Sequence, residues 1–187
     1  LKCPLGFYFE TVLRVPSLQS EAATYGTAMH NSLQRLYERM LQSKQKRFPA
    51  ASTLLKIFES EMDHWRAYFT HKGYQRRARM GQRYLADFYQ QNIKAWSKKA
   101  RVEHNIRHVE VEGVPVNGTI DKLVFQAENK ATIIDYKTGS QDNRKLSGPS
   151  KSQPYGGNYW RQLVFYKLLY EKKDLKKAIS DLIYYAE

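Results

Sequence analysis

The sequence predicts an α/β fold in which N-terminal helices precede a mixed central sheet, and one helix crosses over between two of the strands. Apolar residues recur at helical spacing between residues 25 and 99. From Arg101 onward the apolar period changes to two, which is typical of half-buried strands. Near the end of the chain a helical pattern stands between two strand-like runs, an order that indicates a right-handed crossover and parallel pairing.

The length and charge of the chain limit what it can be. With 187 residues and no internal repeat, residues 1–187 are expected to form a single domain with a substantial core. The 31 Lys and Arg outnumber the 18 Asp and Glu and give a net charge of +13, which indicates nucleic acid as partner, with an anionic membrane surface as the competing interpretation. No apolar run is long enough to span a membrane and no signal peptide is visible, so no membrane partner is expected. The single cysteine, Cys3, allows no internal disulfide, which fits a cytoplasmic location.

The first half of the chain is expected to be helical. Residues 1–16 are apolar and aromatic and are expected to form a short helical or irregular segment packed on the core, followed by a polar linker over residues 17–24. A first long helix is expected over residues 25–46, with His30 one turn into it on an inward-looking face. A second helix is expected from the N-cap candidate Ser52 to Gly73, and a third over residues 76–99.

The third helix carries an unbalanced charge. Between Lys72 and Arg101 there are nine Lys or Arg and one acid, Asp87, with aromatic residues interleaved. This bias favours contact with nucleic-acid phosphates, and the alternative is an ordinary solvated helix face. The predicted phosphate-contacting residues of this helix are Arg76, Arg77, Arg79 and Arg83.

The second half of the chain is expected to form the sheet. Strands are predicted over residues 107–111, 114–116, 118–125 and 131–136, with a turn at residues 112–113 and a polar hairpin loop at residues 126–130. A long loop follows over residues 140–158, and loops of this length are usually functional or disordered. Residues 159–172 then read as a helix and residues 179–185 as a last strand.

Two acids and a lysine stand out in the hairpin. Asp121 and Asp135 each follow an apolar run, and Lys137 lies two residues after Asp135, on the same face of its strand. Carboxylates of this kind can hold Mg²⁺ or Mn²⁺ beside a phosphate, while the lysine orients water or offsets charge on phosphorus. The alternative is a structural ion pair between Asp135 and Lys137 on a solvated strand face. His30 likewise has an alternative, as a core histidine with one hydrogen bond.

Four motifs stand in a recognisable order: Gly26-Thr27-Ala28-Met29-His30, Gly118-Thr119-Ile120-Asp121, Ile134-Asp135-Tyr136-Lys137-Thr138-Gly139, and Gln162 followed four residues later by Tyr166. Together they resemble the RecB-type branch of the PD-(D/E)XK nucleases, over nearly the whole chain. The opening Cys3-Pro4, followed by Phe7-Tyr8-Phe9, is similar to the start of this domain where it is fused to superfamily 1 DNA helicases.

The resemblance implies a restriction-endonuclease-like core and a set of roles. His30, Asp121, Asp135 and the carbonyl of Tyr136 would bind the metal, and Lys137 would be the catalytic lysine, with both aspartates serving catalysis. Gln162 and Tyr166 would brace the site and touch DNA, and Arg144 and Lys145 of the long loop are further candidates for DNA contact. Glu103 can match another acid of the family, but its spacing is loose and it is left out of the predicted set.

The cofactor expected from the resemblance is Mg²⁺ or Mn²⁺. Some relatives also hold an iron–sulfur cluster on four cysteines, the first of them in an opening like Cys3-Pro4. With a single cysteine, this chain is expected to hold no such cluster within its own residues.

The expected function is metal-dependent hydrolysis of DNA phosphodiesters, as an exonuclease or endonuclease acting on single strands or duplex ends in DNA repair and recombination. The resemblance also leads to the expectation that the domain belongs to a longer helicase–nuclease. One alternative is a DNA-binding module with this fold and no useful activity of its own, serving an attached helicase. Another is a structural or protein-interaction domain whose acids form ordinary surface pairs.

Overall fold

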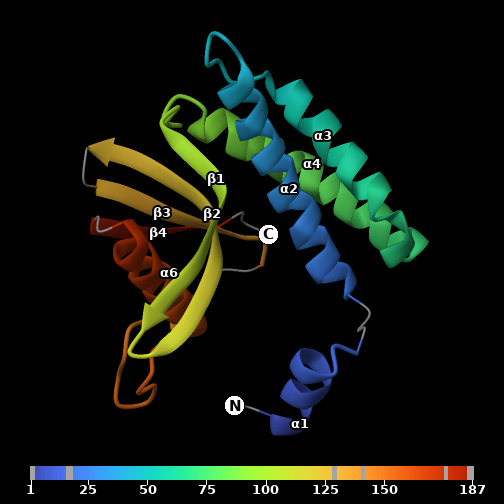
Figure 1. The fold of residues 1–187 in the computed structure, drawn as a ribbon. Helices are drawn as coiled ribbons and strands as arrows, with labels where there is room; N and C mark the ends of the chain where they lie inside the picture. The colour runs from blue at the N-terminus through green and yellow to red at the C-terminus, as the bar shows by residue number, and fades with distance from the viewer. Residues whose placement is uncertain (1–2, 16–18, 128–129, 140–141, 175–176, 185–187) are drawn as a thin grey trace.

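The computed structural model describes residues 3–15, 19–127, 130–139, 142–174 and 177–184 (Figure 1). It confirms the expected α/β class and the order of helices, antiparallel strands and a crossover helix. The elements are α1 (Pro4–Phe7), a π-helical turn (Tyr8–Val12), α2 (Glu21–Gln42), α3 (Ala51–His64), a 3₁₀ turn (Arg66–Tyr68), α4 (His71–Asn92), β1 (Ala100–Val111), β2 (Val114–Ala127), β3 (Lys130–Lys137), α5 (Asn143–Leu146), α6 (Asn158–Asp174) and β4 (Lys177–Tyr184).

The sheet is mixed and has the strand order β1-β2-β3-β4. β2 pairs antiparallel with both β1 and β3, whereas β3 pairs parallel with β4, and α6 provides the crossover between them. Helices α2, α3 and α4 lie on one side of the sheet and α6 lies on the other (Figure 1). Among the described helices, none is long and apolar enough to cross a bilayer.

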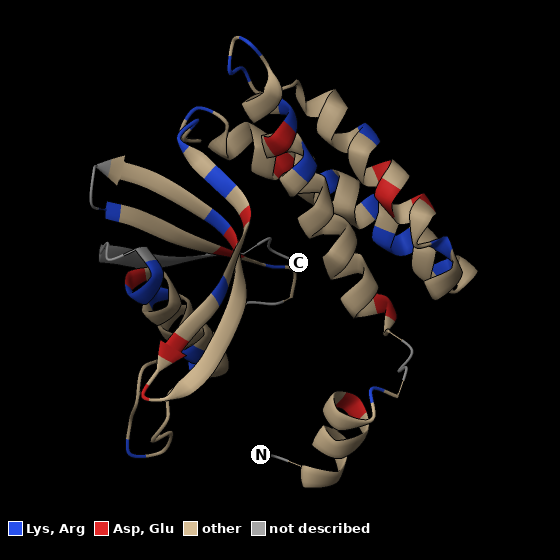
Figure 2. Cartoon of the chain, viewed as in Figure 1, with Lys and Arg blue, Asp and Glu red and all other residues tan. Residues whose placement is uncertain are grey.

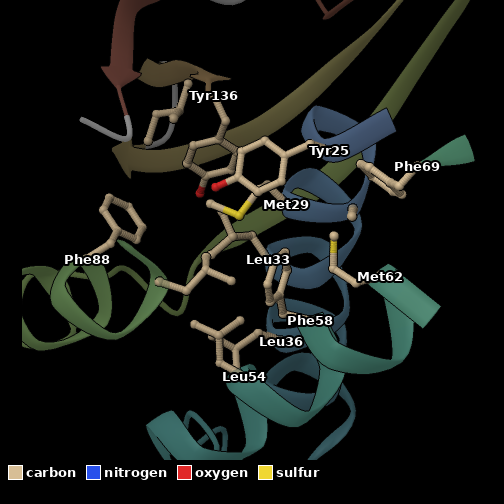
Figure 3. Packing of buried hydrophobic residues seen from close by; sticks show 13 residues of the cluster. Tyr25, Met29, Leu33, Leu36, Leu54, Phe58, Met62, Phe69, Phe88 and Tyr136 are labelled. Atoms are coloured by element: carbon tan, nitrogen blue, oxygen red, sulfur yellow. The ribbon is translucent and has the colours of Figure 1, made fainter. Parts of the chain in front are cut away.

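Two hydrophobic clusters cover the two faces of β3. Ile134 and Tyr136 belong to the cluster that α2, α3 and α4 build (Figure 3). Ala131 and Ile133 belong to the cluster that includes Leu169 of α6. Alternating side chains of β3 therefore enter different cores, as expected for a strand buried on both faces.

The N-terminal segment corrects one prediction. It is helical, as expected, but its apolar side chains do not pack on the core: Leu5, Phe7, Val12 and Leu13 are all exposed. The apolar composition of this segment predicted that it would be buried, but in the part of the chain that the structure describes these side chains remain exposed to solvent.

The helix boundaries also differ from those predicted, because side-chain caps decide them. α2 begins at Glu21, inside the expected linker, since the hydroxyl of Ser20 accepts a hydrogen bond from the Ala23 N–H at 3.2 Å. His30 therefore lies well inside the helix rather than one turn from its start. α4 begins at His71, since Thr70 caps it through the Gly73 N–H at 3.1 Å, and it ends at Asn92.

The second helix was predicted too long at its C-terminus. α3 follows Ala50 and ends at His64, so Ser52 is not its N-cap and Gly73 does not end it. Gly73 lies instead in the first turn of α4, where it is buried.

The strands are longer than predicted. β1 begins at Ala100, and the two strands expected over residues 114–116 and 118–125 are one continuous strand, β2. The long loop is partly ordered, with α5 and an antiparallel bridge between Ser150 and Gln153. Residues 1–2, 16–18, 128–129, 140–141 and 185, which the predicted elements include, lie outside the described residues.

Candidate active site

The predicted acids lie where two paired strands separate. The antiparallel pairing of β2 with β3 extends as far as Lys122 opposite Ile134. Asp121 and Asp135 are the next residues on the two strands. β3 continues its parallel pairing with β4 through Lys137, and β2 continues its pairing with β1. The acids are thus held by well-paired strands at a point where the ladder between them opens.

α2 brings His30 to this opening. The His30 Nε2 atom lies 2.8 Å from the Tyr136 carbonyl oxygen, and Nδ1 lies 3.3 Å from Asp121 Oδ2. The same Asp121 oxygen accepts a hydrogen bond from the Tyr136 N–H at 2.8 Å. His30 therefore contacts the other candidate ligands directly, unlike a histidine held only by the core.

Gly26 explains how closely α2 approaches the end of β3. A Cβ atom at Gly26 would lie 3.2 Å from Thr138 Oγ1, immediately after the strand. Glycine thus lets the helix backbone come close to the strand end, one turn before His30.

The other side of the opening is built by β3 and α6. The Lys137 ammonium group forms an ion pair with the Asp135 carboxylate and donates a hydrogen bond to Gln162 Oε1 at 2.8 Å. Gln162 Nε2 donates in turn to the Tyr166 hydroxyl at 2.9 Å. The ion pair considered as an alternative is present, but Asp135 is only 2% exposed, so it does not lie on a solvated face.

Negative charge accumulates at this site. Burial raises the pKa of Asp135, the nearby Asp121 raises it further, and Lys137 opposes the rise. Burial and the carboxylates of Asp135, Asp121 and Glu103 also raise the pKa of the Tyr166 hydroxyl, against the hydrogen bond from Gln162. A cation at this position would offset the repulsion between these groups.

Glu103 is the residue that the predicted set left out. It lies on β1 opposite Asp121, between the pairs Val102–Lys122 and His104–Ile120. Loss of hydration raises the pKa of Glu103, and the Asp121 charge adds to this effect. Glu103 has a left-handed backbone with φ of 46°, an irregularity within the strand that residue spacing alone does not reveal.

The residue types fit a divalent cation. Asp121, Asp135 and the Tyr136 carbonyl supply hard oxygen atoms, and the His30 imidazole adjoins them. Over the residues that the structure describes, no three His, Cys, Asp or Glu side chains converge as a ready metal site. In this arrangement Asp121 is engaged by His30 and the Tyr136 N–H, and Asp135 by Lys137.

The predicted DNA-contacting arginines of α4 differ in their environments. Arg76, Arg79 and Arg83 are exposed, as a phosphate-binding surface requires. The Arg77 side chain is 14% exposed, lies 3.8 Å from Glu21 and stacks over the Tyr25 ring, so it ties α4 to α2.

The two basic residues of the loop after β3 also differ. Arg144 is paired with Asp142 through an Nε–Oδ1 contact of 3.2 Å. Lys145 lies over the Tyr159 ring at 5.3 Å from its centre, and Lys137 lies 4.9 Å from the centre of the same ring. Lys145 is therefore close to the candidate site.

Comparison with known families gives one match over the full length. The family model of the PD-(D/E)XK nuclease superfamily matches residues 1–187. The search of curated proteins gave no match to the chain.

Proposed function

Because this chain belongs to the PD-(D/E)XK nuclease superfamily, we propose that it is a metal-dependent deoxyribonuclease that hydrolyses phosphodiester bonds in DNA. One observation carries the proposal beyond family membership. His30, Asp121, Asp135 and Lys137 come from α2, β2 and β3 and meet at the opening between the strands. A nuclease fold that only bound DNA would have no physical need to hold the buried Asp135 carboxylate beside the half-buried Asp121, which repels it, so the alternative of an inactive module is not favoured.

Lys137 is well placed to act on the scissile phosphate. Its ammonium group is fixed by Asp135 and Gln162, and it is held on a strand that is buried on both faces. A positioned cation of this kind stabilises the negative charge that develops on the phosphate oxygens in the transition state. Gln162 and Tyr166 keep the ammonium group in place from α6 and act as positioning residues.

The metal-binding residues would be Asp121, Asp135, the Tyr136 carbonyl and His30. A bound Mg²⁺ or Mn²⁺ ion supplies an activated water and Lewis acidity at phosphorus. Imidazole suits Mn²⁺ better than Mg²⁺, which favours the manganese ion when both are offered. The protein supplies the rigid frame, since three of these groups belong to strands β2 and β3.

Within the superfamily, we propose that this chain is a RecB-type nuclease that processes DNA ends in repair and recombination and is attached to a superfamily 1 helicase. Its support is the order of the four motifs and the opening Cys3-Pro4 followed by Phe7-Tyr8-Phe9. DNA as the substrate is supported further by the net charge of +13.

The decisive experiment is a cleavage assay with single-stranded and duplex DNA labelled at either end, in Mg²⁺, Mn²⁺ or EDTA. We expect cleavage with a divalent cation and none in EDTA. The length of the labelled products separates exonuclease action, which releases the end label on a mononucleotide or short oligonucleotide, from endonuclease action, which first gives longer labelled fragments. Absence of cleavage with every cation and substrate, by protein shown to be folded, would contradict the proposal.

His30→Ala provides a sharper test of the metal site. We expect it to weaken Mn²⁺ binding, measured by calorimetry, and to lower cleavage about ten- to a hundred-fold, with a small change in melting temperature. A matched control is His64→Ala, at the last residue of α3 and away from the site. If His30→Ala lowers the melting temperature but leaves Mn²⁺ binding intact, His30 is a structural residue.

The basic face of α4 is expected to hold the DNA backbone away from the reacting phosphate. Phe88 packs its ring 6.4 Å from that of Tyr136, and Arg76 lies twelve residues earlier, roughly 18 Å along the helix. Figure 2 shows the basic positions along α4. This helix therefore packs against the strand that carries Asp135 and Lys137 near one end and presents Arg76 near the other.

Replacing Arg76, Arg79 and Arg83 together with alanine is expected to weaken DNA binding and to reduce the salt slope by about two for single strands. Cleavage at saturating DNA should remain close to that of the parent, because these residues do not contact the reacting groups. The charge-matched control replaces three exposed residues near the α2–α3 junction, namely Lys44, Arg47 and Lys56. Equal effects of the two triple variants would show that only net charge matters.

A further inference from the structure

A polar cavity of about 600 Å³ lies in the segment between β3 and α6. It is separate from the opening between β2 and β3 that holds the carboxylates. Its lining consists of small hydroxyl and amide side chains with two cations and one acid: Asp142, Arg144, Lys145, Ser147, Ser150, Ser152, Gln153 and Asn158.

The walls of this cavity are fixed by backbone hydrogen bonds. The Gly157 N–H donates to the Ser147 carbonyl at 2.8 Å, and the Ser147 N–H donates to the Asn143 carbonyl at 3.0 Å. Ser150 and Gln153 exchange backbone hydrogen bonds at 3.0 and 3.1 Å. A Cβ atom at Gly157 would lie 2.2 Å from the Lys145 carbonyl oxygen, so the start of α6 packs directly against the backbone of α5. Hydrogen bonds and close backbone packing therefore hold the residues that line the cavity in place.

One aromatic ring links the cavity to the candidate active site. The Tyr159 ring is close to both Lys145, which lines the cavity, and Lys137, whose ammonium nitrogen atoms lie 5.3 and 4.9 Å from the ring centre. A strand whose phosphate lies at Lys137 would therefore pass close to the cavity with its neighbouring nucleotide.

The lining suits the sugar–phosphate part of a nucleotide. Lys145 and Arg144 supply positive charge, although Arg144 is partly neutralised by Asp142. Serine hydroxyl groups and the amides of Gln153 and Asn158 provide hydrogen-bonding groups for sugar and phosphate oxygens. The cavity offers no apolar wall among these lining residues for a base.

An aromatic side chain on the same loop can supply that missing surface. Tyr155 lies two residues after Gln153 and is 79% exposed, although an exposed aromatic ring is unfavourable in water. Stacking of a base on such a ring requires that the base is not enclosed in a duplex. This favours an unpaired nucleotide over duplex DNA.

We propose that this cavity binds the sugar–phosphate of an unpaired nucleotide next to the scissile phosphate, with the base of that nucleotide stacked on Tyr155. The proposal rests on the proposed nuclease function and specifies its substrate as a single strand or a frayed end. Tyr159 and Lys145 then position the strand between the cavity and Lys137.

The test measures binding without cleavage. Fluorescence anisotropy in EDTA compares a labelled ten-residue oligothymidylate with a labelled blunt hairpin duplex. Tyr155→Ala and Lys145→Ala are each expected to weaken single-strand binding about ten-fold, and Tyr155→Ala is expected to leave duplex binding unchanged. Lys151→Ala is the matched control, because it removes one exposed positive charge from the same loop without lining the cavity.

Two results would overturn the proposal: an equal loss for single-strand and duplex DNA in Tyr155→Ala, or an equal loss in Lys151→Ala and Lys145→Ala. Either would make the loop a general electrostatic surface. Circular dichroism melting of each variant checks that it is folded, and Lys145→Gln provides a second variant if Lys145→Ala is not. If the binding pattern holds but the parent cleaves no DNA with Mg²⁺ or Mn²⁺, the nuclease function fails and the nucleotide site stands.

Discussion

Replacing Lys137 with alanine is expected to lower DNA cleavage by roughly a hundred- to a thousand-fold, because in the proposed mechanism the ammonium group acts mainly on charge that develops in the transition state. DNA affinity and its salt slope should stay close to those of the parent, since one phosphate contact out of several is lost. Single-turnover cleavage with the protein in excess over DNA measures the chemical step apart from binding.

The variant also leaves Asp135 buried without its ion-pair partner, so its melting temperature must be measured and the rate referred to folded protein. Lys137→Arg is the informative companion, because it keeps the charge and changes the geometry of the donor group. If Lys137→Ala cleaves DNA as fast as the parent, the residue is only the partner of Asp135.

Replacing Lys122 with methionine is expected to stabilise the protein by roughly 3 kcal/mol at pH 7. Lys122 is 1% exposed, with its ammonium nitrogen 3.1 Å from the Tyr37 hydroxyl and over the rings of Tyr37 and Tyr136. Burial lowers the pKa of Lys122 to about 7, and the described contacts of its ammonium group, with the Tyr37 hydroxyl and two aromatic rings, include no carboxylate. Methionine fills a similar volume without a charge, and some of the gain is offset by the unpaired Tyr37 hydroxyl.

The sign of the pH dependence follows from the direction of this shift. Between pH 7 and about 10.5 the unfolded chain holds the Lys122 proton while the folded chain has lost it, so the parent becomes more stable as pH rises. The advantage of Lys122→Met should therefore shrink by up to about 1.4 kcal/mol per pH unit above pH 7.5. Urea unfolding of parent and variant between pH 6 and pH 10 measures the difference, with the exposed Lys56→Met as control. A difference that does not change with pH would show that Lys122 is charged and well solvated in the folded protein.

Local pattern was enough to predict that the central residues of the candidate site lie close together. Asp135 and Lys137 share a face because strand side chains alternate, and the hairpin places Asp121 close to them. His30 lies 106 residues before Tyr136 in the sequence, and only the resemblance to a known family assigned it a role. No local rule predicts which histidine on the inward face of a helix will meet the end of a strand.

Other features depend on tertiary contacts that no local pattern contains. A lysine in a strand normally faces solvent, yet Lys122 is buried and its ammonium group donates a hydrogen bond to the hydroxyl of Tyr37 in α2. Arg77 resembles its exposed neighbours in sequence, but Glu21 and Tyr25 occupy its side chain. Glu103 was left out of the predicted site because its own left-handed backbone interrupts the regular spacing of the strand. The N-terminal segment was expected to be buried because it is apolar, but composition alone does not show whether a surface is available to cover it.

The double burial of β3 has a consequence for how this domain can vary. A slip of β3 by one residue would turn the Tyr136 ring toward the candidate site and the side chains of both Asp135 and Lys137 toward the apolar cluster of α2 and α4. Both the core and the reacting groups would be lost in one step, so insertions and deletions should be tolerated in the hairpin turn and excluded from the strand. The buried apolar side chains of β3, which stabilise the fold, thus also fix the register that places Asp135 and Lys137 in the candidate site.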